Sequence, residues 1–275
     1  THLHDSSQLF GFSDTNPYVE AFFKWLESDL HKTLRELRIT GGEPLMSGHT
    51  WKLLEWFEAN RDKSQTKLAI NSNLGMDSKK LNEFIDAIDG IPDIELYTSC
   101  EAYGDDAEYI RDGLNYKQWF DNLVALQRSG KVKQLHVMAT INGLCLPTLP
   151  QFLEHMMDFK KGWGRDSLTV TLNILRFPSF QSPTVMPYGI REECAAKLEK
   201  FATHYENTVY LHQMEVEHIK RLVEYLRKVE TPHEGASSIE LLEKDFKQFY
   251  EQYDVRRNKD FLKTFPELEY WYHGL

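Results

Sequence analysis

The sequence predicts an α/β protein with a parallel sheet and a helical extension at its carboxyl end. Five strand-then-helix units follow one another from about residue 34 to about residue 204, and from about residue 210 only helical patterns occur. Parallel strands are joined by right-handed crossovers that usually contain a helix, so this alternation favours a parallel sheet with its helices outside. A closed eight-unit barrel takes about 250 residues. We therefore expect an open, partial (β/α) barrel of the TIM type.

The first expected element is a helix that begins at Pro17. Asn16 before it is a favourable N-cap, and proline is preferred at the first helical position. Apolar residues at helical spacing continue from Val19 to Leu30. Residues 1–33 are interpreted as an N-terminal helix and a linker to the sheet.

The core at residues 34–208 alternates strands with helices. The expected strands are LRELRIT (34–40), TKLAIN (66–71), DIELYTS (93–99), VKQLHVMATI (132–141) and SLTVTLNILRF (167–177). The expected helices after them lie at 49–62, 81–88, 116–123, 148–161 and 191–204. Residues 101–115 are expected to form a longer loop, and Thr148 is expected to cap the fourth of these helices.

Residues 209–275 are predicted as a C-terminal helical extension. Three segments have helical patterns, at 211–229, 237–257 and 259–272. The segment VETPHEGASS (229–238) is polar and rich in turn-forming residues, and it is the expected linker between the first two helices.

Composition argues against several classes of protein. Lys and Arg total 32 against 42 Asp and Glu, a net charge of -10, whereas proteins that bind the nucleic acid backbone usually have a basic surface. No apolar run approaches the about 20 residues of a membrane helix, and the first residues, THLHDSSQLF, do not resemble a signal peptide. We expect a cytoplasmic protein with no nucleic acid or membrane partner. Its cysteines, Cys100, Cys145 and Cys194, are far apart and are expected to be buried or free thiols.

The stretch TGGEP at residues 40–44 is the first candidate for a ligand site. It follows an expected strand, and ligands of parallel α/β sheets bind at the loops after the strands. Gly41 and Gly42 permit unusual backbone dihedrals and let a ligand approach the main chain. Pro44 favours an extended Glu43, whose carboxylate suits a cationic group such as an ammonium. The alternative is a tight turn in which the acid points into water.

The other expected strands also end in polar residues. These are Asn71, Ser72 and Asn73 after the second strand, Ser99, Cys100 and Glu101 after the third, and Thr140 and Asn142 at the fourth. Each could hydrogen-bond to a ligand held over the strand ends, and so could Tyr109 and Arg111 in the following loop. Asn and Ser also form caps and turns, and Arg forms surface salt bridges, so a structural role stays open for each residue.

These motifs resemble those of a known family. ITGGEPL (39–45) looks like the GGEP motif of the radical S-adenosylmethionine (radical SAM) enzymes. SCEAYGDDAEYIRDGLNYKQWFDNL (99–123) and YDVRRNKDFLKTFPELEYW (253–271) are similar to later segments of these proteins, the second to the subgroup with a twitch domain. The resemblance extends from about residue 34 to about residue 272.

The resemblance implies an oxidoreductase-type enzyme that uses S-adenosylmethionine as its cosubstrate. It implies that the methionine amino group is bound by Gly41, Gly42, Glu43 and Pro44. It further implies that the methionine carboxylate and the ribose hydroxyls are reached by polar residues at the next strand ends, which by position are Asn71, Asn73, Ser99, Glu101 and Asn142. The adenine is expected at the backbone of residues 173–176. No catalytic residue is assigned.

The 4Fe–4S cluster of this family is held by a Cys-x3-Cys-x2-Cys loop ahead of GGEP, and this sequence contains no such triplet. In the family, an electron from the cluster cleaves S-adenosylmethionine to a 5′-deoxyadenosyl radical, which abstracts hydrogen from the substrate. We expect a fragment whose cluster loop precedes Thr1, so no metal ligand is predicted within the chain. An electron donor and an unknown substrate are then implied, and the exposed edge of the first strand could pair in a homodimer.

Two other functions stay open. The chain could be a cluster-free relative that binds a nucleoside or a peptide without catalysis, or a different barrel enzyme that binds phosphate at Gly41 and Gly42. Upstream sequence with the cysteine triplet would favour the radical SAM enzyme. Protection of the fold against heat by a phosphate analogue, and not by S-adenosylmethionine, would favour the third function.

Overall fold

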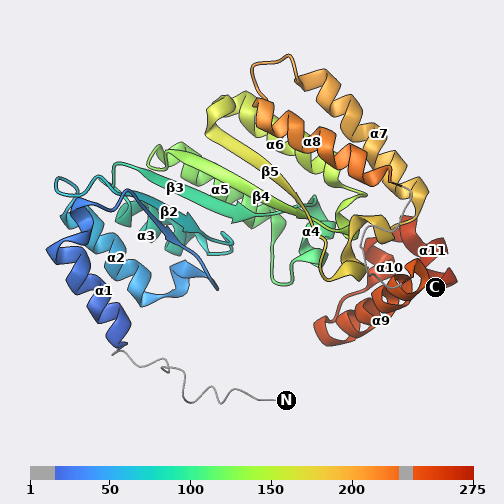
Figure 1. Cartoon of the computed structure of the whole chain (residues 1–275), viewed down its shortest axis with the longest axis horizontal. Helices are drawn as coiled ribbons and strands as arrows, with labels where there is room; N and C mark the ends of the chain where they lie inside the picture. Colours follow the sequence, from blue (N-terminus) through green and yellow to red (C-terminus); the bar gives the residue numbers. More distant parts are fainter. Residues whose placement is uncertain (1–15, 229–237) are drawn as a thin grey trace.

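The computed structural model describes residues 16–228 and 238–275, and it contains a five-stranded parallel sheet (Figure 1). The strands are β1 (Glu36–Ile39), β2 (Lys67–Asn71), β3 (Ile94–Ser99), β4 (Gln134–Ile141) and β5 (Leu168–Ile174). They lie side by side in sequence order, and every neighbouring pair is parallel. The predicted α/β class and parallel sheet are confirmed. The sheet is not closed, because β1 and β5 each pair with one strand.

The helices form where the sequence patterns place them. Those after the strands are α2 (Gly48–Ala59), α3 (Ser78–Ala87), α5 (Tyr116–Ser129), α6 (Leu149–Trp163) and α7 (Tyr188–Tyr205). The first helix, α1 (Pro17–Ser28), begins as predicted after Asn16, whose side chain accepts a hydrogen bond from the backbone N–H of Tyr18 at 3.0 Å. None of the described helices is both long enough and apolar enough to cross a membrane.

The C-terminal part contains α8 (Gln213–Leu226), α9 (Ile239–Arg257), α10 (Phe261–Thr264) and α11 (Glu269–Gly274). The expected single helix at 259–272 is divided, because Pro266 starts a separate 3-10 turn between α10 and α11. The expected linker at 229–238 lies outside the described residues except for Ser238. In Figure 1, α9 to α11 (red) form a group at the end of the molecule remote from α1 and α2 (blue).

The loop expected at 101–115 is instead partly helical, since α4 (Gly104–Ile110) lies within it. This helix buries Tyr109 among aromatic rings of the C-terminal helices, with ring centroids 6.0 Å from Tyr250, 6.0 Å from Phe261 and 5.1 Å from Phe265. Contacts with residues about 140 to 160 positions away stabilise α4, so the local pattern did not predict it.

Thr148 lies at the N-cap position of α6, but its hydroxyl does not cap the helix as expected. The hydroxyl donates to a carboxylate oxygen of Asp106 at 2.9 Å and accepts a hydrogen bond from the backbone N–H of Tyr103 at 3.2 Å. Thr148 therefore joins α6 to the segment around α4.

One face of the sheet is apolar and covered by helices. Its side chains, which include Leu68, Ile70, Leu96, Leu135 and Val137, are fully buried. Trp119 of α5 packs on this side and donates to the hydroxyl of Thr98 at 3.0 Å. Right-handed crossovers between strands in sequential order place all the connecting helices on the same side. The opposite face of the sheet is therefore left for polar residues.

The free edge of β5 is covered by polar side chains of α8. The backbone N–H of Val170 donates to Glu215 at 2.9 Å, and that of Leu172 donates to Nδ1 of His218 at 3.3 Å. Arg221 in turn donates to the carbonyl oxygen of Leu172 at 2.8 Å. Because Glu215, His218 and Arg221 are three residues apart, they lie along one side of the helix. They satisfy edge groups that could otherwise pair with another chain.

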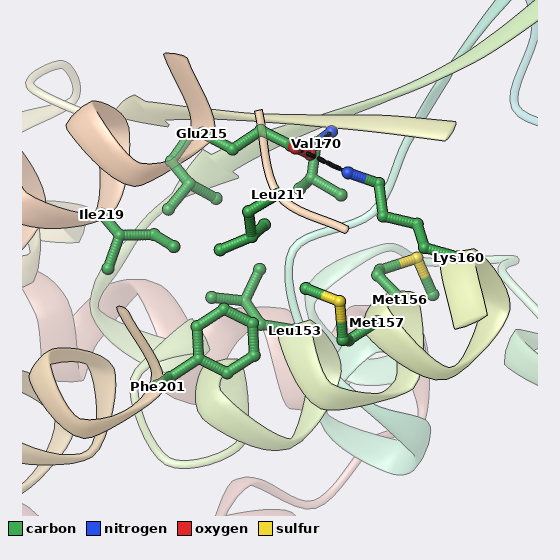
Figure 2. A pocket seen from close by; sticks show the side chains of 10 residues that line it. Leu153, Met156, Met157, Lys160, Val170, Phe201, Leu211, Glu215 and Ile219 are labelled. Atoms are coloured by element: carbon green, nitrogen blue, oxygen red, sulfur yellow. Dashed lines mark hydrogen bonds and ion pairs between the residues drawn. The ribbon is translucent and has the colours of Figure 1, made fainter. Parts of the chain in front are cut away.

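Glu215 also forms a buried ion pair with Lys160 of α6 (Figure 2). The Nζ atom of Lys160 lies 2.7 Å and 2.5 Å from the two carboxylate oxygens, and the two side chains are 1% and 3% exposed. Burial lowers the pKa of Lys160, and Glu215 opposes that shift. Apolar residues surround the pair, and the adjoining cavity of about 20 Å³ has room for about one water molecule. The pair thus holds α6, α8 and β5 together.

Replacing Lys160 with Met is expected to lower the free energy of unfolding by about 3–5 kcal/mol, because it leaves the Glu215 carboxylate buried without its cation. Urea unfolding measures the loss. Lys161→Met is the matched control, since this neighbouring lysine side chain is 41% exposed and its pair with Asp158 contributes at most about 1 kcal/mol.

The double variant Lys160→Met, Glu215→Gln is expected to regain part of the lost stability. A neutral glutamine removes the buried charge, and its carbonyl oxygen can still accept from the N–H of Val170. Equal stability of Lys160→Met and the wild type would show that the pair does not hold these elements together.

Candidate functional site

The TGGEP stretch forms an exposed bend directly after β1. Gly41 has φ of +93° and Gly42 has φ of +54°, a region that residues with a Cβ rarely adopt. A Cβ at either position would meet nothing within 4 Å, so the glycines are required by the backbone conformation and not by crowding. The main chain of the bend is therefore open to a ligand.

Glu43 ties this bend to the end of β2. Its Oε1 atom accepts from the N–H of Leu45 at 3.2 Å and from the hydroxyl of Ser72 at 2.8 Å, and its Oε2 atom accepts from the N–H of Asn73 at 2.7 Å. The carboxylate is half-buried and does not extend into bulk water. Each carboxylate oxygen can accept about two hydrogen bonds, so one acceptor position is left on Oε2.

The other predicted residues at the ends of β1, β2 and β3 lie on different surfaces. Pro44 is buried beneath the bend, and Asn73 is exposed, with its Oδ1 accepting from the N–H of Gly75 at 2.8 Å. Asn71 and Ser99 lie on the face of the sheet opposite the helices, where their register partners are Tyr97 and Met138. Within the described chain, the buried Oδ1 atom of Asn71 has no hydrogen-bond partner.

Glu101 and Asn142 have partners within the protein. Glu101 is buried and accepts from Arg111 at 2.6 Å and 2.9 Å; burial raises its pKa, and the Arg111 charge limits that shift. The Oδ1 atom of Asn142 accepts from the N–H of Leu144 at 2.9 Å and caps a 3-10 turn. Tyr109 is also engaged, since its hydroxyl donates to Asp254 at 2.6 Å. Their expected contacts with a ligand stay predictions.

The sheet face opposite the helices carries a network that the sequence analysis did not identify. We call it the polar-face network, and its members are Glu36, Arg38, Lys67, Glu95, Tyr97, His136 and Thr169. The strand register places all of them on one face. The sequence signal is the alternation of polar and apolar residues in QLHVMATI and LTVTLNI. Parallel strands that are buried on both faces have nearly continuous apolar runs, so this alternation predicts an uncovered face.

Glu95 is the centre of the polar-face network. Its Oε2 atom lies 2.7 Å from Nζ of Lys67, 3.0 Å from the hydroxyl of Tyr97 and 3.3 Å from Nε2 of His136. Burial would raise the pKa of this carboxyl, but the hydrogen bonds from Lys67 and Tyr97 outweigh it and hold the pKa below its usual value. Glu95 is therefore ionised at neutral pH.

His136 links Glu95 to β5. Its Nδ1 atom lies 2.5 Å from the hydroxyl of Thr169, and its ring stacks on that of Tyr97 with centroids 4.2 Å apart. A carboxylate can only accept, so Nε2 carries the proton and Nδ1 accepts from Thr169. Burial lowers the pKa of His136, which agrees with a neutral ring. Arg38 completes the group, with its Cζ atom 4.4 Å from the Tyr97 ring centroid.

The polar-face network and the bend lie at different positions along the strand direction. Glu95 lies near the start of β3, and Ser99 ends that strand about 13 Å further on at about 3.3 Å per residue. Thr140 and Asn173 pair at the same carboxyl end, on the same face as Ser99. The polar face therefore has charged groups at its base and uncharged hydrogen-bonding groups near the bend, an arrangement that can bind and orient a polar ligand.

The residues of the described chain do not fit a 4Fe–4S cluster. Such clusters are bound by cysteine thiolates. The three cysteines are buried free thiols, as predicted, and burial raises the pKa of both Cys100 and Cys194 to about 12. Over residues 16–228 and 238–275, no group of three or more His, Cys, Asp or Glu side chains is arranged to hold a metal ion.

No protein-family model matches the chain, and no curated protein does.

Replacing Glu43 with Gln is expected to lower the free energy of unfolding by about 1–3 kcal/mol, because an amide nitrogen cannot accept the hydrogen bonds that a carboxylate oxygen accepts. Ser72→Ala removes one of the three bonds and should cost about 1 kcal/mol. Glu58→Gln on the exposed side of α2 is the control, with a change within about 0.5 kcal/mol. If Glu43→Gln unfolds at the same urea concentration as the wild type, Glu43 does not stabilise the bend.

His136 is expected to make stability fall in mild acid. Its folded pKa lies below that of the unfolded chain, so the unfolded state takes up the proton first. The contribution is complete above about pH 6.5 and is lost as pH falls from there through the folded pKa. Urea midpoints at pH 7.5 and 5.5 should therefore differ less in His136→Gln than in the wild type. His204→Gln, at an exposed position of α7, should keep the wild-type difference.

Proposed function

We propose that this protein is the S-adenosylmethionine-binding part of a radical SAM enzyme, with its sheet as an open, partial (β/α) barrel. The methionine end of the cosubstrate lies at the Gly41–Gly42 bend, and its ribose lies near Asn71 and Ser99. The substrate occupies the polar face below them. The observation that carries the proposal is the anchored bend: a glycine backbone open to a ligand, fixed by Glu43 at the carboxyl ends of β1 and β2.

The bend has the chemistry that an ammonium group requires. Backbone carbonyls and a carboxylate are hydrogen-bond acceptors, and Glu43 keeps one acceptor position on Oε2. Its other three bonds fix the carboxylate in place, so little conformational entropy is lost when a ligand binds. Glu43 thus has two roles in the proposal, since it holds the bend and accepts from the ligand.

The second observation that supports the proposal is the unpaired side-chain oxygen of Asn71. A buried amide oxygen without a partner is costly, and a ligand hydroxyl or ammonium would satisfy it. Tyr97, the register partner of Asn71 on β3, lies on the same face, and so does Ser99 at the end of that strand. This chain would therefore bind and orient the nucleoside, since its described residues do not fit the cluster.

A second candidate is a cluster-free protein that binds a nucleoside or a peptide without catalysis. The described residues carry the proposed binding groups but no group that fits a cluster, which agrees with this candidate. The two candidates share the binding site and differ in chemistry. Only the enzyme would cleave S-adenosylmethionine reductively once joined to a segment that holds a cluster.

Calorimetric titration with S-adenosylmethionine tests the shared site. We expect weak binding by the wild type, and a loss of about fivefold or more in affinity for Asn71→Ala and for Ser99→Ala, which each remove a hydrogen bond. Gln134→Ala is the control, because Gln134 lies on the same face at the opposite end of β4. It should stay within about twofold of the wild type.

Glu43→Gln should weaken S-adenosylmethionine binding more than Ser72→Ala does, because only the first removes the negative charge. Absence of binding by the wild type at millimolar ligand, or equal losses in Asn71→Ala and Gln134→Ala, would contradict the proposed site.

A further inference from the structure

A basic pocket lies at the carboxyl end of β5, beside α8. It has a volume of about 320 Å³ and is lined by Asn173, Ile174, Arg176, Arg221, Glu224, Tyr225 and Lys228. Three cations and one carboxylate give it a local excess of two positive charges, in a protein whose net charge is -10. A concentration of positive charge in an acidic protein indicates an anionic ligand.

Two of the cations are held in place by the fold. Arg221 donates one hydrogen bond from Nη2 to the carbonyl oxygen of Leu172 at 2.8 Å, which orients its guanidinium and leaves its other N–H groups for a ligand. The backbone carbonyl of Lys228 accepts from Nη1 of the buried Arg191 at 2.7 Å. The Nζ atom of Lys228 lies 5.7 Å from the ring centroid of Tyr225, a wall of the pocket.

Arg191 adds positive charge next to the pocket. It is 8% exposed, and its guanidinium donates to the carbonyl oxygens of Met186, Leu226 and Lys228. Burial lowers its pKa, but an arginine stays protonated in proteins. Carbonyl oxygens satisfy its hydrogen bonds without cancelling its charge, so Arg191 contributes to the potential that a ligand meets.

Apart from Glu224 in the pocket lining, the nearby carboxylates do not neutralise these cations. Glu192 and Glu199 pair with Arg227, at 3.1 Å and 3.0 Å. Within residues 16–228 and 238–275, no ion pair joins Arg176, Arg221 or Lys228 to a carboxylate of the protein. Charged groups that the described residues leave unpaired around one cavity are available to a ligand.

We propose that this pocket binds the phosphate group of a small phosphorylated substrate. A phosphate monoester carries a charge of about -1.5 to -2 at pH 7, which matches the excess of two positive charges, and arginine matches the geometry of its oxygens. Asn173 of the pocket pairs in register with Thr140, so the pocket adjoins the polar face. The rest of the substrate would extend over that face. Only this last statement depends on the proposed function.

Phenyl phosphate is the probe, titrated calorimetrically at constant ionic strength. The variant Arg176→Gln, Lys228→Gln should bind it at least about tenfold more weakly than the wild type, because charge-assisted bonds are lost. Arg221 is kept, since it also supports the edge of β5. Lys220→Gln is the matched control, because this exposed lysine of α8 does not line the pocket and pairs with Glu206. It should stay within about twofold.

A further titration separates this pocket from the bend, because Glu43→Gln should keep wild-type affinity for phenyl phosphate. Unfolding in urea checks that each variant is folded. Benzoate should bind more weakly than phenyl phosphate, because it carries a single charge.

The proposal is overturned if the wild type does not bind phenyl phosphate, or if benzoate binds equally well. It is also overturned if Lys220→Gln loses as much affinity as the double variant, because the attraction would then be general and not confined to the pocket.

Discussion

The sequential order of parallel strands determines how this molecule can be used. Because successive crossovers have the same hand, the helices gather on one face and leave the other without a helical cover. The covered face supplies the apolar core, and the uncovered face carries Glu95, Tyr97 and His136. The bend at Gly41 and the pocket at Asn173 lie at the same ends of the outermost strands, so both proposed ligand sites border one polar surface.

Charged groups stabilise the sheet in two different ways. Lys160 and Glu215 form a dry pair that holds helices to the edge of β5, and the surrounding apolar side chains exclude water. Glu95 instead lies among Lys67, Tyr97 and His136 on a partly open face, where several donors share one carboxylate. The first arrangement is mainly structural. In the second, Glu95 is 8% exposed, whereas Glu36 and Arg38 stay exposed to solvent.

Local sequence patterns predicted the strands, the helices that follow them and the helical extension, because periodicity and capping are local properties. They did not predict α4, whose Tyr109 depends on aromatic residues far along the chain. The bonds of Glu43 could not be foreseen either, since Ser72 and Asn73 follow it by 29 and 30 positions. The polar face was different, because its signal was present in the alternation of polar and apolar residues in β4.

The hydrogen bond from Val170 to Glu215 has a consequence for the dynamics of the protein. The backbone amide of an edge strand usually exchanges its hydrogen with solvent readily, but this one donates into a buried ion pair. It can exchange only when α8 separates from the sheet. Deuterium uptake at that single amide therefore reports how often α8 detaches, and with it how often Arg221 leaves the wall of the basic pocket.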